Sequence, residues 1–236
     1  MLVLGVDTAT AAASVALVRD GEPVALESCP VASGHGETLL PLVTALFDRV
    51  GELLTAIDGI GVSLGPGSFS GLRVGLSTVK GLAYALGCQV AGIPTLDALA
   101  QLVTAWDGLI CPLLDARNGE VYAALFRRGA DGQQERLTQD LLLTPEALCR
   151  QVTAPCALVG DALERYGTTI QASCRARAPV FLLASRPLLG EVIAKLAWER
   201  FVRGDADDLY TLEPAYVRPP DARLPQATQK GLKNLP

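Results

Sequence analysis

A glycine-rich loop at residues 65–71, with the sequence GPGSFSG, joins two regular patterns and constrains the fold more than any other segment. The apolar run 57–64 before the loop predicts a strand, and the residues after it predict a helix of about 16 residues that ends near the C-cap glycine Gly87. Another strand-like run, 89–93, follows that helix. Strand, loop, helix and strand in this order predict a mixed α/β protein.

The rest of the chain extends this pattern into two α/β units. In the first unit we expect strands at 2–6, 13–18 and 24–29, a helix near 36–50 in which Pro41 is tolerated in the first turn, and a helix at 95–105. In the second unit we expect strands at 109–114, 120–126 and 157–159, an Asn-Gly turn at 118–119, and helices at 144–152 and 187–202. We therefore predict an N-terminal lobe at 1–105, a C-terminal lobe at 106–218 and a flexible basic tail at 219–236.

Composition excludes several classes of protein. Half of the residues are hydrophobic, which argues against disorder, but the apolar runs are broken well short of the ~20 residues of a membrane-spanning helix. The six cysteines form no C-x-x-C pair, so we expect them to be reduced thiols. The first residues do not show the pattern of a signal peptide, so we expect none. With a net charge of −5, strong autonomous binding to nucleic acid is not expected.

The glycine loop itself has two interpretations. It lacks the third glycine of the dinucleotide-binding pattern and the Gly-Lys-Ser/Thr of a P-loop. Backbone N–H groups and two hydroxyls at a helix N-terminus suit an anion, whereas the glycines also suit a tight turn, which is the commoner role. Asp7, at the end of the first strand, is similarly either a nucleotide- or metal-facing acid or a turn residue.

The helix that follows the loop carries a stripe of mostly small residues. Gly75 and Gly81 belong to this stripe, and a glycine inside a helix costs about 1 kcal/mol relative to alanine. A glycine at such a position is explained if another element approaches the helix closely. That element is either part of this chain or a helix of a partner. The helix near 36–50 has an apolar stripe wider than one core face needs, which favours a subunit interface across both helices.

The single histidine, His35, limits the enzymatic possibilities. A metalloprotease of the H-E-x-x-H type needs two histidines one helical turn apart. Neither Ser68 nor Ser70 lies in the G-x-S-x-G context of a serine hydrolase. We predict no catalytic residue and no metal ligand in this chain.

Five sequence blocks resemble the TsaB (YeaZ) family and follow one another along nearly the whole chain. They are LGVDTAT at 4–10, ASVAL at 13–17, GPGSFSGLRVG at 65–75, LDARNGEVY at 114–122 and PAYVR at 214–218. The resemblance implies a two-lobed actin-like/Hsp70-like ATPase fold with a mixed sheet and helices in each lobe. It also implies a cytoplasmic role in forming N6-threonylcarbamoyladenosine beside the anticodon of tRNAs that read codons beginning with A.

In that family this subunit is a non-catalytic scaffold. It activates and dimerises with a larger, metal-bearing transferase paralogue (TsaD-type), and a small ATPase subunit (TsaE-type) docks on the pair. The resemblance further implies a homodimer when the chain is alone, contact with tRNA only through the complex, and no membrane. The alternative is a small actin-like ATPase or kinase that uses Asp7 and the 65–71 loop.

The resemblance also assigns candidate site residues. A vestigial nucleotide site, with no required cofactor but with weak ATP or ADP binding, maps to Asp7, Thr8, Gly65, Gly67, Ser68 and Gly71. The partner interface, which combines the resemblance with the two helix stripes, maps to Leu39, Val43, Leu46, Val50, Gly71, Val74, Gly75, Thr78, Gly81 and Ala85.

Overall fold

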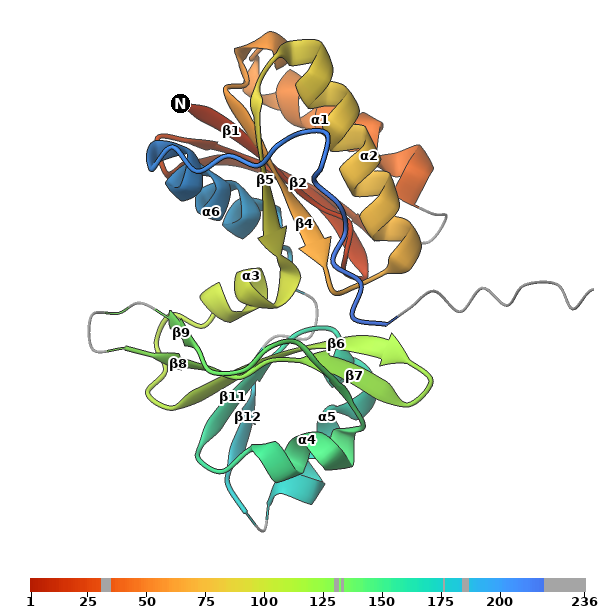
Figure 1. Cartoon of the computed structure of the whole chain (residues 1–236), viewed down its shortest axis with the longest axis vertical. Coiled ribbons are helices and arrows are strands. Elements are labelled where there is room, and N and C mark those ends of the chain that lie inside the picture. Colours follow the sequence, from red (N-terminus) through yellow and green to blue (C-terminus); the bar gives the residue numbers. More distant parts are fainter. Residues whose placement is uncertain (31–34, 130–131, 133, 176, 184–186, 219–236) are drawn as a thin grey trace, which may run out of the picture.

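The computed structural model describes residues 1–30, 35–129, 132, 134–175, 177–183 and 187–218, without the side chains of residues 35–37. It contains two sheets, one above the other in Figure 1, with helices around each. The predicted tail at 219–236 lies outside the described residues, and so does the side chain of His35. No helix in the described ranges is long and apolar enough to cross a membrane.

The first sheet has the strand order β3-β2-β1-β4-β5. Its strands are β1 (Leu2–Asp7), β2 (Ala12–Arg19), β3 (Glu22–Pro30), β4 (Gly59–Gly65) and β5 (Gln89–Pro94). β1, β4 and β5 are parallel, whereas β2 and β3 are antiparallel to their neighbours. Helices α1 (His35–Val50) and α2 (Phe69–Leu86) pack on one face over a shared apolar core, and the short helix η1 (Leu54–Ala56) precedes β4.

The second sheet has the order β10-β7-β6-β11-β12, and in addition β8 pairs with β6 and β9 pairs with β8. Its strands are β6 (Leu109–Arg117), β7 (Glu120–Ala123), β8 (Phe126–Arg128), β9 (Gln134–Arg136), β10 (Leu141–Leu143), β11 (Cys156–Val159) and β12 (Val180–Leu182). Helices α4 (Pro145–Gln151) and α5 (Ala162–Cys174) cover its outer face, and α3 (Thr95–Gln101) covers the inner face. The Asn-Gly turn is confirmed: Asn118 and Gly119 have φ of 51° and 83°, as a two-residue hairpin loop requires.

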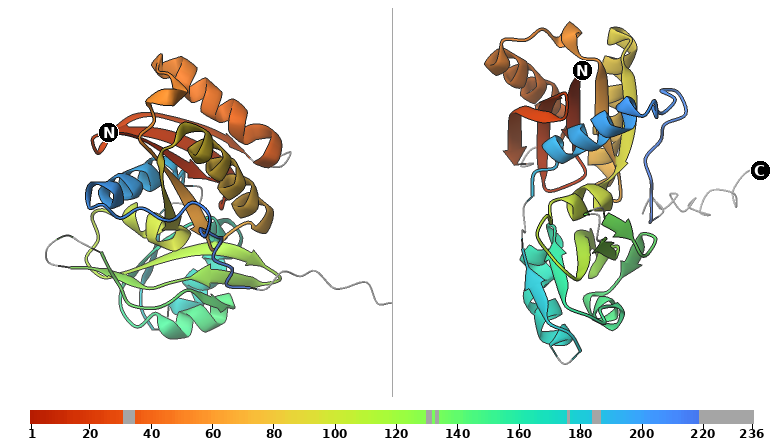
Figure 2. Two further views of the ribbon diagram at one scale, coloured as in Figure 1. Left: turned by 45° about the horizontal axis from the view of Figure 1, so that its top comes forward. Right: turned by 90° about the vertical axis from the view of Figure 1, so that its left-hand side faces the viewer.

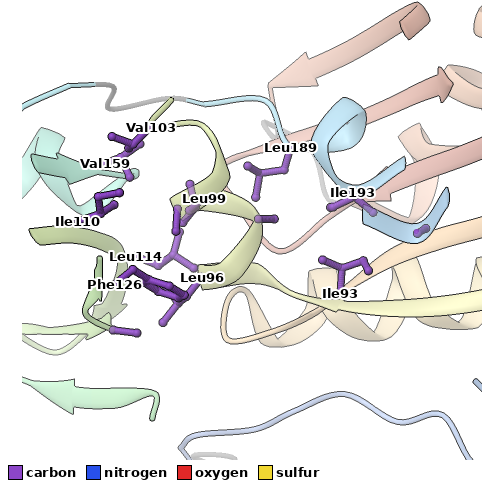
Figure 3. Close-up of a cluster of buried hydrophobic side chains, with 14 of the residues drawn as sticks. Ile93, Leu96, Leu99, Val103, Ile110, Leu114, Phe126, Val159, Leu189 and Ile193 are labelled. Atoms are coloured by element: carbon purple, nitrogen blue, oxygen red, sulfur yellow. The ribbon is translucent and has the colours of Figure 1, made fainter. Parts of the chain in front are cut away.

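Helix α6 (Gly190–Val202) packs on the first sheet, although the sequence prediction placed it in the second lobe. Strand glycines create the room for this helix. A Cβ on Gly5 would lie 2.0 Å from the Gly190 carbonyl oxygen, and one on Gly61 would lie 2.6 Å from the Ala197 Cβ. The two lobes are thus linked through α6 as well as through α3, and apolar side chains from both sheets meet around α3 in one buried cluster (Figure 3).

Several predicted elements differ from those observed. The expected helix at 95–105 ends at Gln101, and the expected strand at 120–126 is divided into β7 and β8. Pro41 lies in the interior of α1, beyond its first turn. The helix α5 and the short strands β9, β10 and β12 were not expected, because segments of three residues carry little periodicity and α5 has a mean hydropathy close to neutral.

Candidate functional site

A cavity of about 720 Å³ lies between the two lobes, where β4 ends and α2 begins. The first lobe contributes the turn after β1 and the glycine loop. The second lobe contributes the end of β6, and the segment after α6 closes the third side. The charged groups around the cavity are Arg73, Asp115, Arg117, Asp161 and Arg218.

Close packing accounts for the glycines of the loop. A Cβ on Gly67 would lie 2.5 Å from the Ala9 carbonyl oxygen, and one on Gly65, where φ is +117°, would lie 2.6 Å from the Ala215 carbonyl oxygen. The Ser68 hydroxyl caps α2 by accepting a hydrogen bond from the Gly71 N–H at 3.3 Å. These contacts support the tight-turn interpretation, because the loop packs closely against other parts of the chain and the N–H groups of Gly65, Ser68 and Gly71 already have partners there.

Asp7 and Thr8 lie behind the cavity wall. The fully buried Asp7 carboxylate accepts hydrogen bonds from the Ala9 N–H at 2.9 Å and from the Thr10 hydroxyl at 2.6 Å. Burial raises the pKa of Asp7, and these hydrogen bonds partly oppose the rise. The Thr8 hydroxyl donates to the Gly71 carbonyl at 2.8 Å.

Only Gly67 and Ser68 of the six candidate nucleotide residues line the cavity. As arranged, the chain does not fit a phosphate group held by Asp7, because that carboxylate is enclosed by its own loop. Weak ATP or ADP binding elsewhere in the cavity stays a prediction. In the described ranges, no group of three or more His, Cys, Asp or Glu side chains is placed to hold a metal ion.

The second lobe places two carboxyl groups at the cavity. Asp115, near the end of β6, donates its backbone N–H to the Asp161 Oδ1 at 3.0 Å, and the Arg165 guanidinium lies 3.5 Å from the Asp115 Oδ2. The pKa of Asp161 is raised to about 6. Burial is the largest cause, the hydrogen bond from the Asp115 N–H opposes the rise, and the neighbouring Asp115 carboxylate adds to it. Asp161 is not among the candidates that the sequence indicates. Its position after the parallel strand β11 is the signal that could have identified it.

The third side of the cavity is a group of aromatic and basic side chains that is also absent from the sequence candidates. The rings of Phe69 and Tyr216 lie 5.0 Å apart, and the Arg73 guanidinium stacks over Phe69 at 4.1 Å. The Arg73 Nε–H donates to the Tyr216 hydroxyl at 2.9 Å. The PAYVR block contains Tyr216 and was the available signal, although its distance along the chain from the loop gave no hint of contact.

The structure separates the candidate interface residues into two groups. Most of them contribute to the core of the first lobe or pack against it: Leu39, Val43, Leu46, Val50, Gly71, Val74 and Gly75. Leu39, Val43 and Leu46 have side chains at most 3% exposed and pack into the core of the first lobe, so the predicted interface role of the α1 stripe stays a prediction. Thr78 is half-buried, and Gly81 and Ala85 are exposed on α2.

The two helix glycines have different surroundings. A Cβ on Gly75 would lie 2.1 Å from the Thr8 Oγ1, so a neighbour within the chain explains this glycine. A Cβ on Gly81 would meet no atom of the described residues within 4 Å. The intrachain explanation therefore holds for Gly75, whereas the partner explanation stays a prediction for Gly81.

Comparisons with known proteins agree with this fold. Residues 30–155 match the family described as TsaD, tRNA N6-adenosine threonylcarbamoyltransferase. The chain is 31% identical over 226 residues to the tRNA threonylcarbamoyladenosine biosynthesis protein TsaB of Escherichia coli K12, covering 92% of this chain and 95% of that protein. The solved structure of YeaZ from Pseudomonas aeruginosa superimposes with a TM-score of 0.77 at 29% identity, covering 92% of this chain and 99% of that one.

A more distant structure shows the fold alone. The activator of the 2-hydroxyisocaproyl-CoA dehydratase from Clostridium difficile, solved with bound ADPNP, has a TM-score of 0.52 at 10% identity and covers 86% of this chain. The expected two-lobed α/β fold of the actin-like ATPases is therefore confirmed. From its near full-length similarity to TsaB and YeaZ, the chain belongs to the TsaB family of tRNA threonylcarbamoyladenosine biosynthesis proteins.

Proposed function

We propose that this chain is the non-catalytic scaffold of a complex that forms N6-threonylcarbamoyladenosine next to the anticodon of tRNAs reading codons that begin with A. It activates a larger threonylcarbamoyl transferase paralogue by dimerising with it. Two observations support the proposal: TsaB relatives are named for this biosynthesis, and the chain itself matches the transferase family over residues 30–155. A common ancestry of the two subunits favours pairing of equivalent helices.

Gly81 is the observation that carries the proposed interface. A glycine inside a helix lowers helix stability by about 1 kcal/mol relative to alanine, yet nothing in the described part of this chain approaches Gly81. The exposed Ala85 lies one turn further along α2. Small residues at this spacing let the backbone of another helix approach closely, so we assign the exposed face of α2 to the transferase paralogue.

The same proposal includes the other partners and the location. A small ATPase subunit docks on the pair, and tRNA is contacted only through the complex. The chain forms a homodimer in the absence of its partner, and the complex is cytoplasmic. The alternative, an ATPase or kinase that uses Asp7, has less support because Asp7 is enclosed by hydrogen bonds within its own loop.

The affinity of the chain for the purified transferase paralogue tests this assignment. Gly81→Leu adds a large side chain to the exposed face of α2, where a Cβ meets no described atom within 4 Å, so the fold should remain intact. The dissociation constant for the transferase paralogue should rise about tenfold or more. Ala85→Leu should act in the same direction. Ala172→Leu is the matched control, because Ala172 is an exposed small residue of α5 in the other lobe. Unchanged affinity in both α2 variants would refute the assignment.

A further inference from the structure

The segment that follows α6 is fastened to the first lobe. Arg200 pairs with Asp205 and Asp207, and the Asp207 N–H donates to the Val90 carbonyl at 2.9 Å beside β5. Further along, the Ala215 N–H donates to the Leu64 carbonyl at 2.8 Å. Residues 205–218 thus run along the first lobe towards the second, as the dark blue trace in Figure 2 shows.

The end of this segment reaches the second lobe. Arg218 Nη1 donates to the Ala116 carbonyl at 2.7 Å, and Arg218 Nη2 forms an ion pair with the Glu120 carboxylate. The Arg218 side chain is only 17% exposed, so solvent screens this pair less than an exposed one. Ala116 and Glu120 flank the β6–β7 turn, which places the contact on the second lobe at the edge of the cavity.

A second contact between the lobes is of a different kind. Around α3 the side chains of Ile93, Leu99 and Leu114 belong to one buried apolar cluster that joins the two sheets (Figure 3). Such a cluster is close-packed and is broken only at a large free-energy cost. The contact of Arg218 is polar and rests on one side chain. It can therefore break while the apolar cluster, against which the neighbouring Val217 packs, stays intact.

We propose that residues 205–218 form a clasp that holds the two lobes closed over the cavity. The apolar cluster around α3 acts as the hinge, and the Arg218–Glu120 pair is the releasable end of the clasp. An anion that enters the cavity competes with Glu120 for Arg218, so its binding and opening of the clasp are coupled. This inference does not depend on the proposed function, because it concerns only contacts within the chain.

Hydrogen–deuterium exchange of the full chain, followed by mass spectrometry, tests the clasp. In Arg218→Ala, we expect the amides that border the cavity, at 67–72 and 114–117, to exchange about tenfold faster, since loss of a partly buried charged pair raises the population of the open state. The amides of α3 and α6 should keep their wild-type rates. Glu120→Ala should give the same pattern from the opposite partner. Glu213→Gln is the control, because it removes a charge from an exposed position of the same segment.

Two results would overturn the clasp. Exchange at 67–72 and 114–117 that stays at the wild-type rate in both variants would show that the pair does not hold the lobes. Faster exchange spread evenly over α3, α6 and both sheets would show that the pair supports the fold as a whole. Small-angle scattering gives a second measurement: the radius of gyration should increase in both variants and stay constant in Glu213→Gln, and a constant value in all three would also refute the clasp.

Discussion

The contact between Gly75 and Thr8 gives the sharpest prediction for the fold. A Cβ at position 75 would lie 2.1 Å from the Thr8 Oγ1, far inside van der Waals contact. Thr8 is fully buried, and its hydroxyl donates to the Gly71 carbonyl at 2.8 Å. In Gly75→Ala the Thr8 side chain must therefore rotate or the helix must shift, and either change weakens this hydrogen bond.

The expected magnitude combines two opposing effects. Overpacking at a buried site and loss of a buried hydrogen bond each cost about 1–3 kcal/mol, whereas replacing a helix glycine by alanine contributes about 1 kcal/mol. We expect Gly75→Ala to lower the free energy of unfolding by about 1–5 kcal/mol. In the Thr8→Ala background the oxygen is gone, so the same change should raise that free energy by about 1 kcal/mol.

Urea unfolding of the four proteins in this cycle, at one protein concentration, measures the coupling. Gly81→Ala is the control, and it should be stabilising by about 1 kcal/mol because no described atom lies within 4 Å of its Cβ. If Gly75→Ala is as stabilising as Gly81→Ala in the otherwise unchanged chain, the steric explanation of Gly75 is wrong. The original prediction of Gly75 as a partner-facing residue would then regain support.

Three further perturbations test the packing and the charges. Gly5→Ala should lower the free energy of unfolding by about 3 kcal/mol or more, because its Cβ would lie 2.0 Å from the backbone oxygen of Gly190. A urea unfolding midpoint equal to that of wild type would contradict the observed packing of α6 on β1. Since the pKa of Asp161 is raised to about 6 in the folded chain, ionisation of this carboxyl opposes folding. As the pH rises from about 4 to about 7, wild type should therefore lose stability relative to Asp161→Asn. A difference in unfolding free energy that does not change with pH would contradict this. Arg200→Ala removes the pairing with Asp207 and should cost about 2–3 kcal/mol, seen as a lower Tm, whereas an unchanged Tm would show that this pairing contributes little.

Much of the fold could be predicted because local patterns and tertiary structure agree. The glycine loop, the helix that ends at Gly87 and the Asn-Gly turn each have a local steric cause, and the structure contains all three. The place of α6 has no local cause, since a helix that follows second-lobe strands returns to the first sheet. The interior glycines of β1 and β4, Gly5 and Gly61, were the available sign that another element lies close to those strands.

The site was less predictable, because its residues meet from distant parts of the chain. Tyr216 and Phe69 are separated by most of the sequence, and neither has a periodic pattern that indicates the other. The apolar stripe of α1 looks the same whether it faces a partner or its own core, and only the packing assigns Leu39 and Leu46 to the core. Gly75 and Gly81 likewise share one stripe, and Thr8 alone distinguishes them.

Reconstituted transfer tests the central proposal most directly. The assay measures threonylcarbamoyl transfer from threonylcarbamoyl-adenylate to tRNA by the purified transferase paralogue, with and without this chain. We predict that adding the chain increases the rate strongly, and that Gly81→Leu at the same concentration increases it much less. A rate that is the same with and without the chain would contradict the proposed role as an activating scaffold.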